Sequence, residues 1–266
     1  QEVLGGPPPA PGAVRLYGPA DFDGPEPPPD LQTLAPYARP VSLAVPVVLT
    51  APGVAPAQTA ALAGPLASLG RMMGWMAGES SIYRVHVTLE DGIELAYPGM
   101  GGYPAGYDPR ARGRYRRALA STTPHWGPPY RDHDGRLLLA CGVALRAPGG
   151  RLLGAATITA EARVVAELLR GEPAGSRGYL VDEEGNVVVS QDGDAGDAPG
   201  DAEGNVRLSP LPLPGAHDRI RATPAPVGVS EERGALVGYG RLPSVGWYYA
   251  FAVDEQALAS SLRGWP

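Results

Sequence analysis

The sequence predicts an α+β protein in which two antiparallel sheets form two modules. Strand–turn–strand patterns with glycine in the turn occur on both sides of a polar break at Gly171–Gly175. An apolar stripe at helical spacing precedes them, between about Pro56 and Met76. The chain of 266 residues is long enough to bury a substantial core, as one large domain or two small ones. We therefore expect one module over residues 80–172 and a second over residues 173–253.

Residues 1–54 are predicted to be an arm and an edge segment. Prolines and glycines are frequent up to about residue 36, and this composition favours an extended, flexible chain over one that builds a core. A packed arm is the alternative. Residues 41–49 are prone to form a strand, and Pro46 places that strand at a sheet edge, because proline cannot donate a ladder hydrogen bond.

A long helix is predicted over residues 55–79. Pro65 predicts either a bend or a late start for it. Trp75 and the methionines are expected to pack against a neighbouring surface rather than to line a cofactor site. The apolar stripe of this helix consists of Leu62, Leu66, Leu69, Met73 and Met76.

Four strands are predicted for the first module. Ser81–Leu89 and Ile93–Tyr97 flank one turn, and Leu137–Arg146 and Leu152–Thr159 flank another. Thr159 is a candidate N-cap for the short amphipathic helix that follows. Strand pair, helix, loop, strand pair and helix is the element order of a PAS-like module.

The second module is predicted to open with two strands between Tyr179 and Ser190 and to close with two strands between Gly234 and Val253. The acidic, glycine-rich segment 191–205 is expected to be a solvated loop, because its aspartates lack the spacing of an EF-hand. Residues 254–266 are expected to form a last helix that Asp254 caps.

The segment Tyr107–Asp132 concentrates arginine and tyrosine in a chain that is otherwise mostly apolar and small. Asp108 can cap a helix over residues 109–120, which would place Arg112 and Tyr115 on one face. The Trp-Gly-Pro-Pro-Tyr run that follows predicts a rigid loop. A guanidinium, phenols and an indole brought together in this way can hold a small carboxylate or a zwitterion.

Ordered motifs extend from this segment toward the C-terminus. The first two, Tyr-Asp-Pro-Arg-x-Arg and Trp-x-x-Pro-Tyr-x-Asp, are carried by Tyr107, Asp108, Pro109, Arg110, Arg112, Tyr115, Ala118, Trp126, Pro129, Tyr130 and Asp132. A glycine-containing strand at Gly150–Thr159 and the segment Gly178–Ser190 follow. In this order the motifs resemble the double Cache (dCache) family of extracellular sensor domains, over roughly residues 55–260. Two residues depart from the family pattern: Arg114 stands where the family usually has Trp, and Thr159 where amino-acid-binding members carry Asp.

The resemblance implies two PAS-like modules on a long N-terminal helix, with a small-molecule site in the first module. The chain would be the extracellular or periplasmic sensor of a transmembrane receptor, such as a kinase, a cyclase or a chemoreceptor. Its last helix would lead toward a membrane anchor, and a homodimer through the N-terminal helix is a further expectation. The ligand-binding residues that the resemblance implies are Tyr107, Arg112, Arg114, Tyr115, Trp126, Tyr130, Asp132 and Thr159.

Arg112 is expected to hold a ligand carboxylate with its guanidinium fork, while Asp132 meets an ammonium or anchors its loop. Thr159 offers a neutral hydroxyl where an acid would pair with a ligand ammonium. We therefore expect a preference for a carboxylate or another small anion and weak or no binding of ordinary α-amino acids, with an amino acid or amine as the alternative ligand. Arg114 would strengthen this preference if it points inward; a surface-facing side chain is the other option.

Other functions find less support in the sequence. The net charge of −6 argues against a nucleic-acid surface, and no apolar run is long enough to cross a bilayer. The four histidines lack metal-ligand spacing, no serine lies in a nucleophile elbow, and the absence of lysine excludes a Walker phosphate loop. We expect no enzyme activity, no metal and no cofactor. The alternative to a sensor is a structural or interaction ectodomain with a degenerate pocket, in which the arginines and aromatics only pack.

Overall fold

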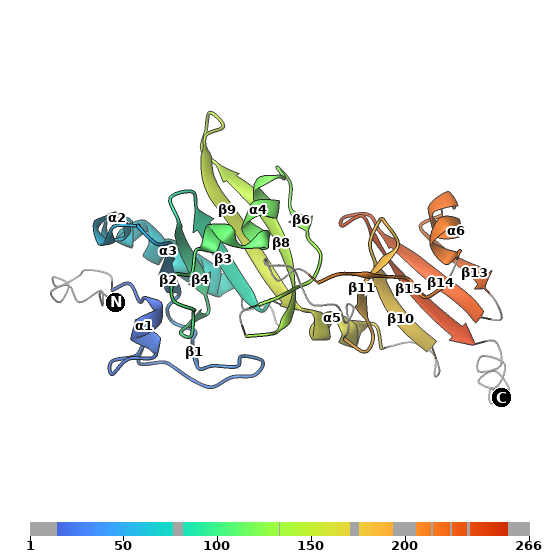
Figure 1. Ribbon diagram of the computed structural model, residues 1–266, viewed down its shortest axis with the longest axis horizontal. Coiled ribbons are helices and arrows are strands. Elements are labelled where there is room, and N and C mark those ends of the chain that lie inside the picture. Colours follow the sequence, from blue (N-terminus) through green and yellow to red (C-terminus); the bar gives the residue numbers. More distant parts are fainter. Residues whose placement is uncertain are drawn as a thin grey trace. The chain divides into compact units, whose positions relative to one another are not determined.

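The computed structural model describes residues 15–76, 82–132, 134–170, 176–193, 206–213, 215–223, 225–232 and 235–254. These residues form two compact units (Figure 1). The first unit takes the described residues of Gln1–Gly127, Asp132–Arg136 and Ala140–Ala160. The second takes those of Pro128–Arg131, Leu137–Leu139 and Glu161–Pro266.

An antiparallel seven-stranded sheet organises the first unit, in the order β2-β4-β3-β9-β8-β6 with β7 paired to β8. A separate two-stranded sheet pairs β1 with β5. The predicted hairpins are present as β3–β4 and β8–β9, and Pro46 separates β1 from β2, which lies at the sheet edge. The bounds are β1 Val41–Ser42, β2 Val47–Thr50, β3 Arg84–Leu89, β4 Ile93–Tyr97, β5 Gly99–Met100, β6 His125–Trp126, β7 Tyr130–Arg131, β8 Leu137–Arg146 and β9 Leu152–Glu161.

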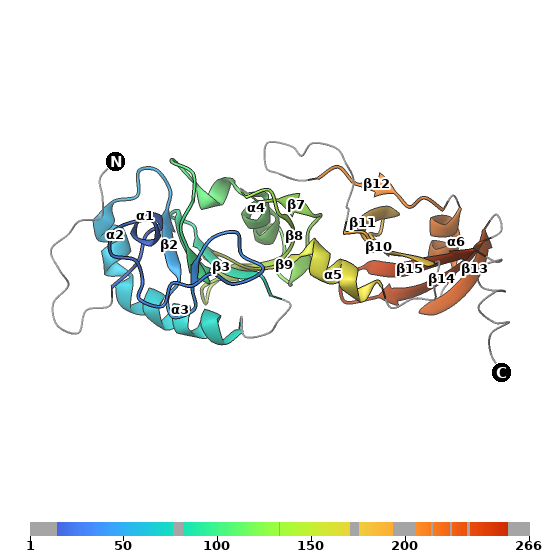
Figure 2. The same ribbon diagram turned by 90° about the horizontal axis from the view of Figure 1, so that it is seen from below.

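Helices lie on opposite faces of this sheet: α3 (Ala63–Met76) on one and α4 (Gly113–Leu119) on the other (Figure 2). Successive side chains of a strand point to opposite faces. Val85 and Val87 of β3 and Leu95 of β4 therefore turn toward α3, where they form one core cluster with Leu66 and Met73. The alternate residues of these strands turn toward α4, and Arg84 of β3 and Glu94 of β4 are among them.

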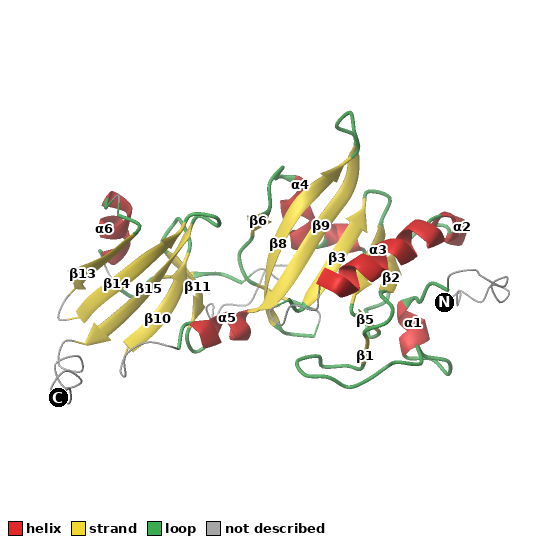
Figure 3. Cartoon of the chain, turned by 180° about the vertical axis from the view of Figure 1, so that it is seen from behind, coloured by secondary structure: helices red, strands yellow, loops and turns green. Residues whose placement is uncertain are grey.

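The predicted N-terminal helix consists of two helices, α2 (Pro56–Ala61) and α3, which are separated at Leu62 (Figure 3). Pro65 lies in the first turn of α3, so the prediction of a late start is confirmed. Leu66 and Met73 of the predicted stripe are buried in the cluster below α3, and Leu62 and Leu69 pack against it. Outside the stripe, Trp75 is 84% exposed and Met72 is 53% exposed. The expectation that Trp75 packs within this chain is therefore wrong.

The N-terminal arm is packed rather than flexible from residue 15 onward, contrary to the favoured prediction. Phe22 of the short helix α1 (Pro19–Phe22) is buried in a cluster with Val47 and Leu49 of β2 and Ala96 of β4. Tyr17 forms a bridge with Val47 of the sheet. Burying one phenylalanine stabilises by about 1.5–3 kcal/mol, which explains how a proline-rich segment can be held against a sheet.

Two predicted helix starts are wrong, each for a local reason. Asp108 does cap a turn, by accepting a hydrogen bond from the Arg110 backbone N–H, but that turn is the short 3-10 helix η1 (Pro109–Ala111). The α-helix α4 begins after it, with Arg112 at the N-cap in extended conformation. Arg112 and Tyr115 therefore do not share a helix face.

Thr159 is likewise not an N-cap, because β9 continues through it. Glu161 occupies the N-cap position of α5 (Ala162–Leu168), and the Thr159 hydroxyl donates instead to the Arg84 carbonyl, 3.3 Å away. Helix α5 belongs to the second unit, although it was predicted within the first module.

The second unit contains an antiparallel six-stranded sheet in the order β12-β11-β10-β15-β14-β13. Its core joins strand residues such as Val181 and Val237 to Ile220 of α6 (Ala216–Ala222). A large antiparallel sheet in each unit confirms the predicted α+β class; α6, β12 and β13 were not predicted. Most of the acidic segment and the proposed last helix lie outside the described residues. The bounds are β10 Ser176–Val181, β11 Asn186–Ser190, β12 Ser209–Pro210, β13 Val227–Glu232, β14 Ala235–Leu242 and β15 Trp247–Asp254.

Candidate ligand-binding site

The face of the first sheet that is turned toward α4 carries a buried polar cluster. Alternate residues of β3 supply Arg84, His86 and Thr88, and Glu94 lies opposite Thr88 on β4. Each of these side chains is at most 3% exposed. Thr157 and Thr159 of β9 lie opposite His86 and Arg84, respectively. We call this set, together with Arg114, the interior polar cluster.

Glu94 and Arg114 form the central ion pair of this cluster. Arg114 Nη2 donates to the two Glu94 carboxylate oxygens at 2.8 and 3.0 Å, and to the Tyr107 hydroxyl at 3.0 Å. The Thr88 hydroxyl donates to the second Glu94 oxygen. Burial alone would raise the pKa of Glu94, but the Arg114 guanidinium and the His86 ring outweigh it and lower the pKa to about 2. Glu94 is therefore ionised at neutral pH and neutralises Arg114.

His86 lies beside this pair and is neutral. Its Nδ1 is 3.3 Å from Glu94 Oε1 and 3.4 Å from Arg114 Nη2. Burial and the neighbouring Arg114 charge lower the pKa of His86 to about 4, although Glu94 acts in the opposite direction. A neutral ring serves one of these neighbours at a time, since Nδ1 either donates to Glu94 or accepts from Arg114.

The lowered pKa values of His86 and Glu94 predict that the stability of the fold is sensitive to acid. An unfolded histidine titrates near 6.5, so below that pH the unfolded chain binds a proton that folded His86 rejects until about pH 4. Stability should fall as pH drops through this window, and fall further from about 4.5 toward 2 as Glu94 is protonated in the unfolded chain. Melting temperatures between pH 7.5 and 4 test this expectation. His86→Gln should flatten the upper part of the curve, and exposed His125→Gln should leave it unchanged; equal curves for all three proteins would contradict it.

Arg112 and Asp132 form the second charged pair, and both were predicted as site residues. Their nearest nitrogen and oxygen are 3.8 Å apart, and the side chains are 21% and 8% exposed. Charge-assisted hydrogen bonds are about 2.7–2.9 Å long, so these two groups attract each other without forming a direct hydrogen bond. Arg112 Nε is buried and has no hydrogen-bond partner among the described residues. The pair therefore leaves donor capacity inside the unit.

The predicted role of Arg114 needs correction. Its side chain points inward, but its charge is already balanced by Glu94, so it cannot by itself make the site favour anions. The Thr159 hydroxyl is also occupied, because it is buried and donates a hydrogen bond to the Arg84 backbone carbonyl. Tyr107 reaches the cluster through Arg114, as a site residue should.

Three other predicted residues lie in different surroundings. Tyr115 packs on Ala118 and Ala155, where burial and the charge of Glu90 raise its pKa. Trp126 is half-buried in β6, opposite Cys141 of β8. Tyr130 is buried in β7 and groups with the second unit. Of the predicted residues, Tyr107, Arg112, Arg114, Asp132 and Thr159 thus lie in the first unit's interior or at its edge, while Tyr115, Trp126 and Tyr130 lie in these other surroundings.

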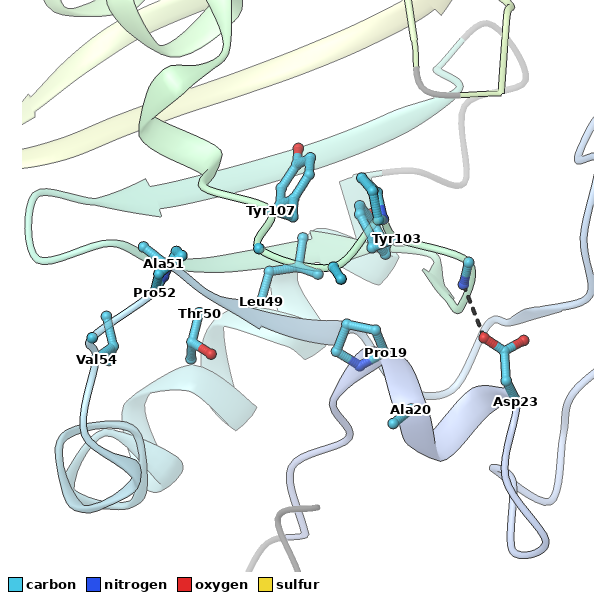
Figure 4. A pocket seen from close by; sticks show the side chains of 15 residues that line it. Pro19, Ala20, Asp23, Leu49, Thr50, Ala51, Pro52, Val54, Tyr103 and Tyr107 are labelled. Atoms are coloured by element: carbon cyan, nitrogen blue, oxygen red, sulfur yellow. Dashed lines mark hydrogen bonds between the residues drawn. The ribbon is translucent and has the colours of Figure 1, made fainter. Parts of the chain in front are cut away.

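A cavity of about 790 Å³ borders the loop that carries Tyr107 (Figure 4). Its lining includes Pro19 and Asp23 from the arm, Leu49 of β2, and Tyr103 and Tyr107. The Gly102 backbone N–H donates to Asp23 at 3.0 Å, which fastens the loop to the arm. In Figure 4 the Tyr107 ring points away from Thr50 and Val54, on the opposite side of the loop from most of the lining. Tyr107 therefore separates this cavity from the interior polar cluster.

Sequence reasoning missed Arg84, His86 and Glu94. A signal was present, since Arg84, His86 and Thr88 alternate with valines in a strand whose other face is apolar. Alternation of this kind usually indicates one solvent-exposed face. Here α4 and the Tyr107 loop cover that face, so the same pattern marks buried charges.

Two further observations concern other kinds of site. Within the described ranges, no group of three or more His, Cys, Asp or Glu side chains is arranged to hold a metal ion. None of the described helices combines the length and the hydropathy that a bilayer-spanning segment requires.

Comparison with known proteins gives no match to any family model or curated protein. Solved structures with similarity include the ligand-binding domain of the Pseudomonas aeruginosa amino acid chemoreceptor PctC in complex with GABA, at 22% identity and a TM-score of 0.48, covering 70% of this chain and 81% of that one. The ligand-binding domain of the Pseudomonas fluorescens chemoreceptor CtaA with L-alanine has 21% identity, a TM-score of 0.49 and coverages of 76% and 85%. That of the P. aeruginosa amino acid chemoreceptor PctB with L-Gln has 18% identity, a TM-score of 0.48 and coverages of 76% and 91%.

Proposed function

We propose that this chain is the sensor domain of an extracellular or periplasmic receptor region and that its first unit binds a small carboxylate. The observation that carries the proposal is the pair Arg112 and Asp132, two largely buried opposite charges whose closest atoms are 3.8 Å apart. The buried Arg112 Nε adds a donor without a partner among the described residues. The ordered motifs from Tyr107 to Asp132, which resemble those of dCache sensors, support the same placement.

The chemistry of this pair suits a ligand that enters between its members. A carboxylate oxygen can accept from Arg112 Nε, and the guanidinium fork favours two-point contact with a planar carboxylate. Asp132 can accept from an ammonium or a hydroxyl of the same ligand. Because Thr159 is bonded to the Arg84 backbone, it provides no second acid for an ammonium, which favours carboxylates over plain amines.

Signalling would follow from a population shift. A ligand that binds one arrangement of the first unit more tightly stabilises that arrangement, and a parent receptor would transmit the change across the membrane to a kinase, cyclase or chemoreceptor output. The full-length receptor would be anchored in the membrane through segments that flank this domain.

A thermal-shift screen of organic acids, amino acids and amines tests the proposal. A ligand that binds the folded chain raises its melting temperature, because at a free concentration L it adds a free energy of RT ln(1 + L/Kd) to the stability of the fold. We expect carboxylates to raise it and amines without a carboxylate to have no effect. Failure of every carboxylate to shift the melting temperature would favour the alternative, an interaction ectodomain with a degenerate pocket. The Glu94–Arg114 pair supports that alternative, since Arg114 stands where the dCache pattern has Trp and its charge is already balanced by Glu94.

We also propose that α3 provides a homodimer contact. Met72 and Trp75 are three residues apart, so they lie on one helix face, and both are exposed. Sedimentation velocity should show a concentration-dependent dimer for the parent chain. Trp75→Ser should raise the dimer dissociation constant at least tenfold, since large aromatic side chains dominate many protein interfaces. A chain that stays monomeric at high concentration would contradict this proposal.

A further inference from the structure

Arg84 is a buried cation in the middle of the first sheet. Its residue is 1% exposed, and β3 fixes its backbone by pairing with β9 opposite Thr159. The Thr159 hydroxyl also donates to the Arg84 carbonyl. The side chain therefore starts from a rigid strand rather than from a loop that could swing out to solvent.

The guanidinium of Arg84 has few partners for a buried charge. Nη2 donates to the Pro98 carbonyl over 3.5 Å, at the limit of a hydrogen bond, and the Tyr103 ring centroid is 5.4 Å from Cζ. Within the described part of the chain, Nε has no hydrogen-bond partner and no carboxylate oxygen forms an ion pair with this group. A buried charge is costly unless it is paired and hydrogen-bonded.

Tyr103 cannot serve as the counter-ion. Burial raises the pKa of its phenol far above the usual value of about 10, so the hydroxyl is neutral at pH 7. One carboxylate, that of Asp132, is among the groups whose charge acts on Arg84. Asp132 already pairs with Arg112. The Arg84 guanidinium itself stays protonated at neutral pH, since an arginine side chain is effectively always charged in proteins.

Three guanidinium groups and two carboxylates lie in or beside the interior polar cluster, so one positive charge remains without a paired carboxylate in the part of the chain that the structure describes. Arg114 is balanced by Glu94 and Arg112 by Asp132, while His86 is neutral. Arg84 is the third guanidinium, and no carboxylate among the described residues forms an ion pair with it. Thr157 Oγ1, on the residue opposite His86, is another buried polar atom without a hydrogen-bond partner among the described residues.

We propose that Arg84 binds an anionic group of the ligand, so that the site prefers molecules with a net charge of −1 to neutral zwitterions. This inference rests on the proposed sensor function. A ligand with one carboxylate for Arg84 and a zwitterionic end for Arg112 and Asp132 satisfies all three groups, as an acidic amino acid would. A neutral amino acid would leave Arg84 unbalanced.

Matched ligand pairs test the inference. In the parent chain, L-glutamate and L-aspartate should bind at least about 30-fold more tightly than L-glutamine and L-asparagine, which have nearly the same shape without the extra charge. In Arg84→Met, which keeps an unbranched apolar stem, the ratio of the amide's Kd to the acid's Kd should fall toward one. Acetate and succinate, added to the panel, show whether one or two carboxylates are required. Isothermal titration calorimetry supplies the dissociation constants.

Stability of the ligand-free variants separates a binding role from a packing role. Arg84→Met should melt at or above the temperature of the parent, because it removes a buried charge that lacks a counter-charge. Arg39→Met, at an exposed arginine of the arm, is the matched control and should leave the ligand preference unchanged.

The outcomes distinguish this inference from the proposed function. If no member of the panel binds the parent, the sensor proposal fails. If carboxylates bind but glutamate shows no advantage over glutamine, or if Arg84→Met keeps that advantage, the assignment of Arg84 is overturned while the sensor proposal stands. A strongly destabilised Arg84→Met would show that Arg84 has a structural role and would also overturn the assignment.

Discussion

Replacing Glu94 by Gln should lower the free energy of unfolding by about 3–5 kcal/mol, the usual result of removing one partner of a buried ion pair. The substitution keeps the size of the side chain and removes only its charge. Arg114 would then be left in the interior without a counter-charge, at 4% exposure. Chemical denaturation followed by circular dichroism measures the change.

A double variant provides the control. Glu94→Leu with Arg114→Met replaces both charges by apolar side chains, and such replacements of buried pairs are often neutral or stabilising. We therefore expect the double variant to recover most of the stability that Glu94→Gln loses. If Glu94→Gln unfolds at the same denaturant concentration as the parent, Glu94 and Arg114 do not form a buried pair in solution.

Replacing Arg112 by Ala should remove ligand binding and preserve the fold. Truncating one partner of a buried charge-assisted contact costs about 2–5 kcal/mol of binding free energy, or roughly 30-fold to several thousand-fold in Kd. The fold should persist because the backbone of Arg112, not its side chain, starts α4: its carbonyl accepts from the Tyr115 and Arg116 backbone N–H groups. Titration of the best ligand from the screen measures the loss.

Arg110→Ala is the matched control for this experiment. Arg110 is two residues away and pairs with Asp108 near the surface, so its loss should leave ligand affinity unchanged. Equal affinity of Arg112→Ala and the parent would place the binding site elsewhere. Failure of Arg112→Ala to fold would assign Arg112 a structural role and favour the alternative function.

The hairpins could be predicted from the sequence because their signals are local. Gly92 has a φ of 92° in the β3–β4 turn, a conformation that glycine adopts without strain. The same local signals misplaced the start of α4, since Asp108 caps a turn of 3-10 helix equally well. The docking of Phe22 depends on the apolar surface that β2 and β4 present to it, which the arm's own composition does not reveal.

The candidate site was only partly predictable for a related reason. Motif spacing identified Arg112 and Asp132, and both are present as a pair in the structure. It could not show that Arg114 is balanced by Glu94 or that Arg84 lacks an ion-pair partner among the described residues, because burial of a strand face is decided by segments distant in sequence. Tyr115 and Tyr130 carry the motif but pack in other surroundings, so motif membership did not determine their contacts.

A crystal structure of the chain with the tightest carboxylate from the screen is the most direct test of the central claim. The account predicts a carboxylate oxygen within hydrogen-bond distance of Arg112 Nε in the first unit, with Asp132 beside the ligand. A ligand bound in the second unit, or in the cavity between the arm and the Tyr103–Tyr107 loop without contact to Arg112, would contradict it.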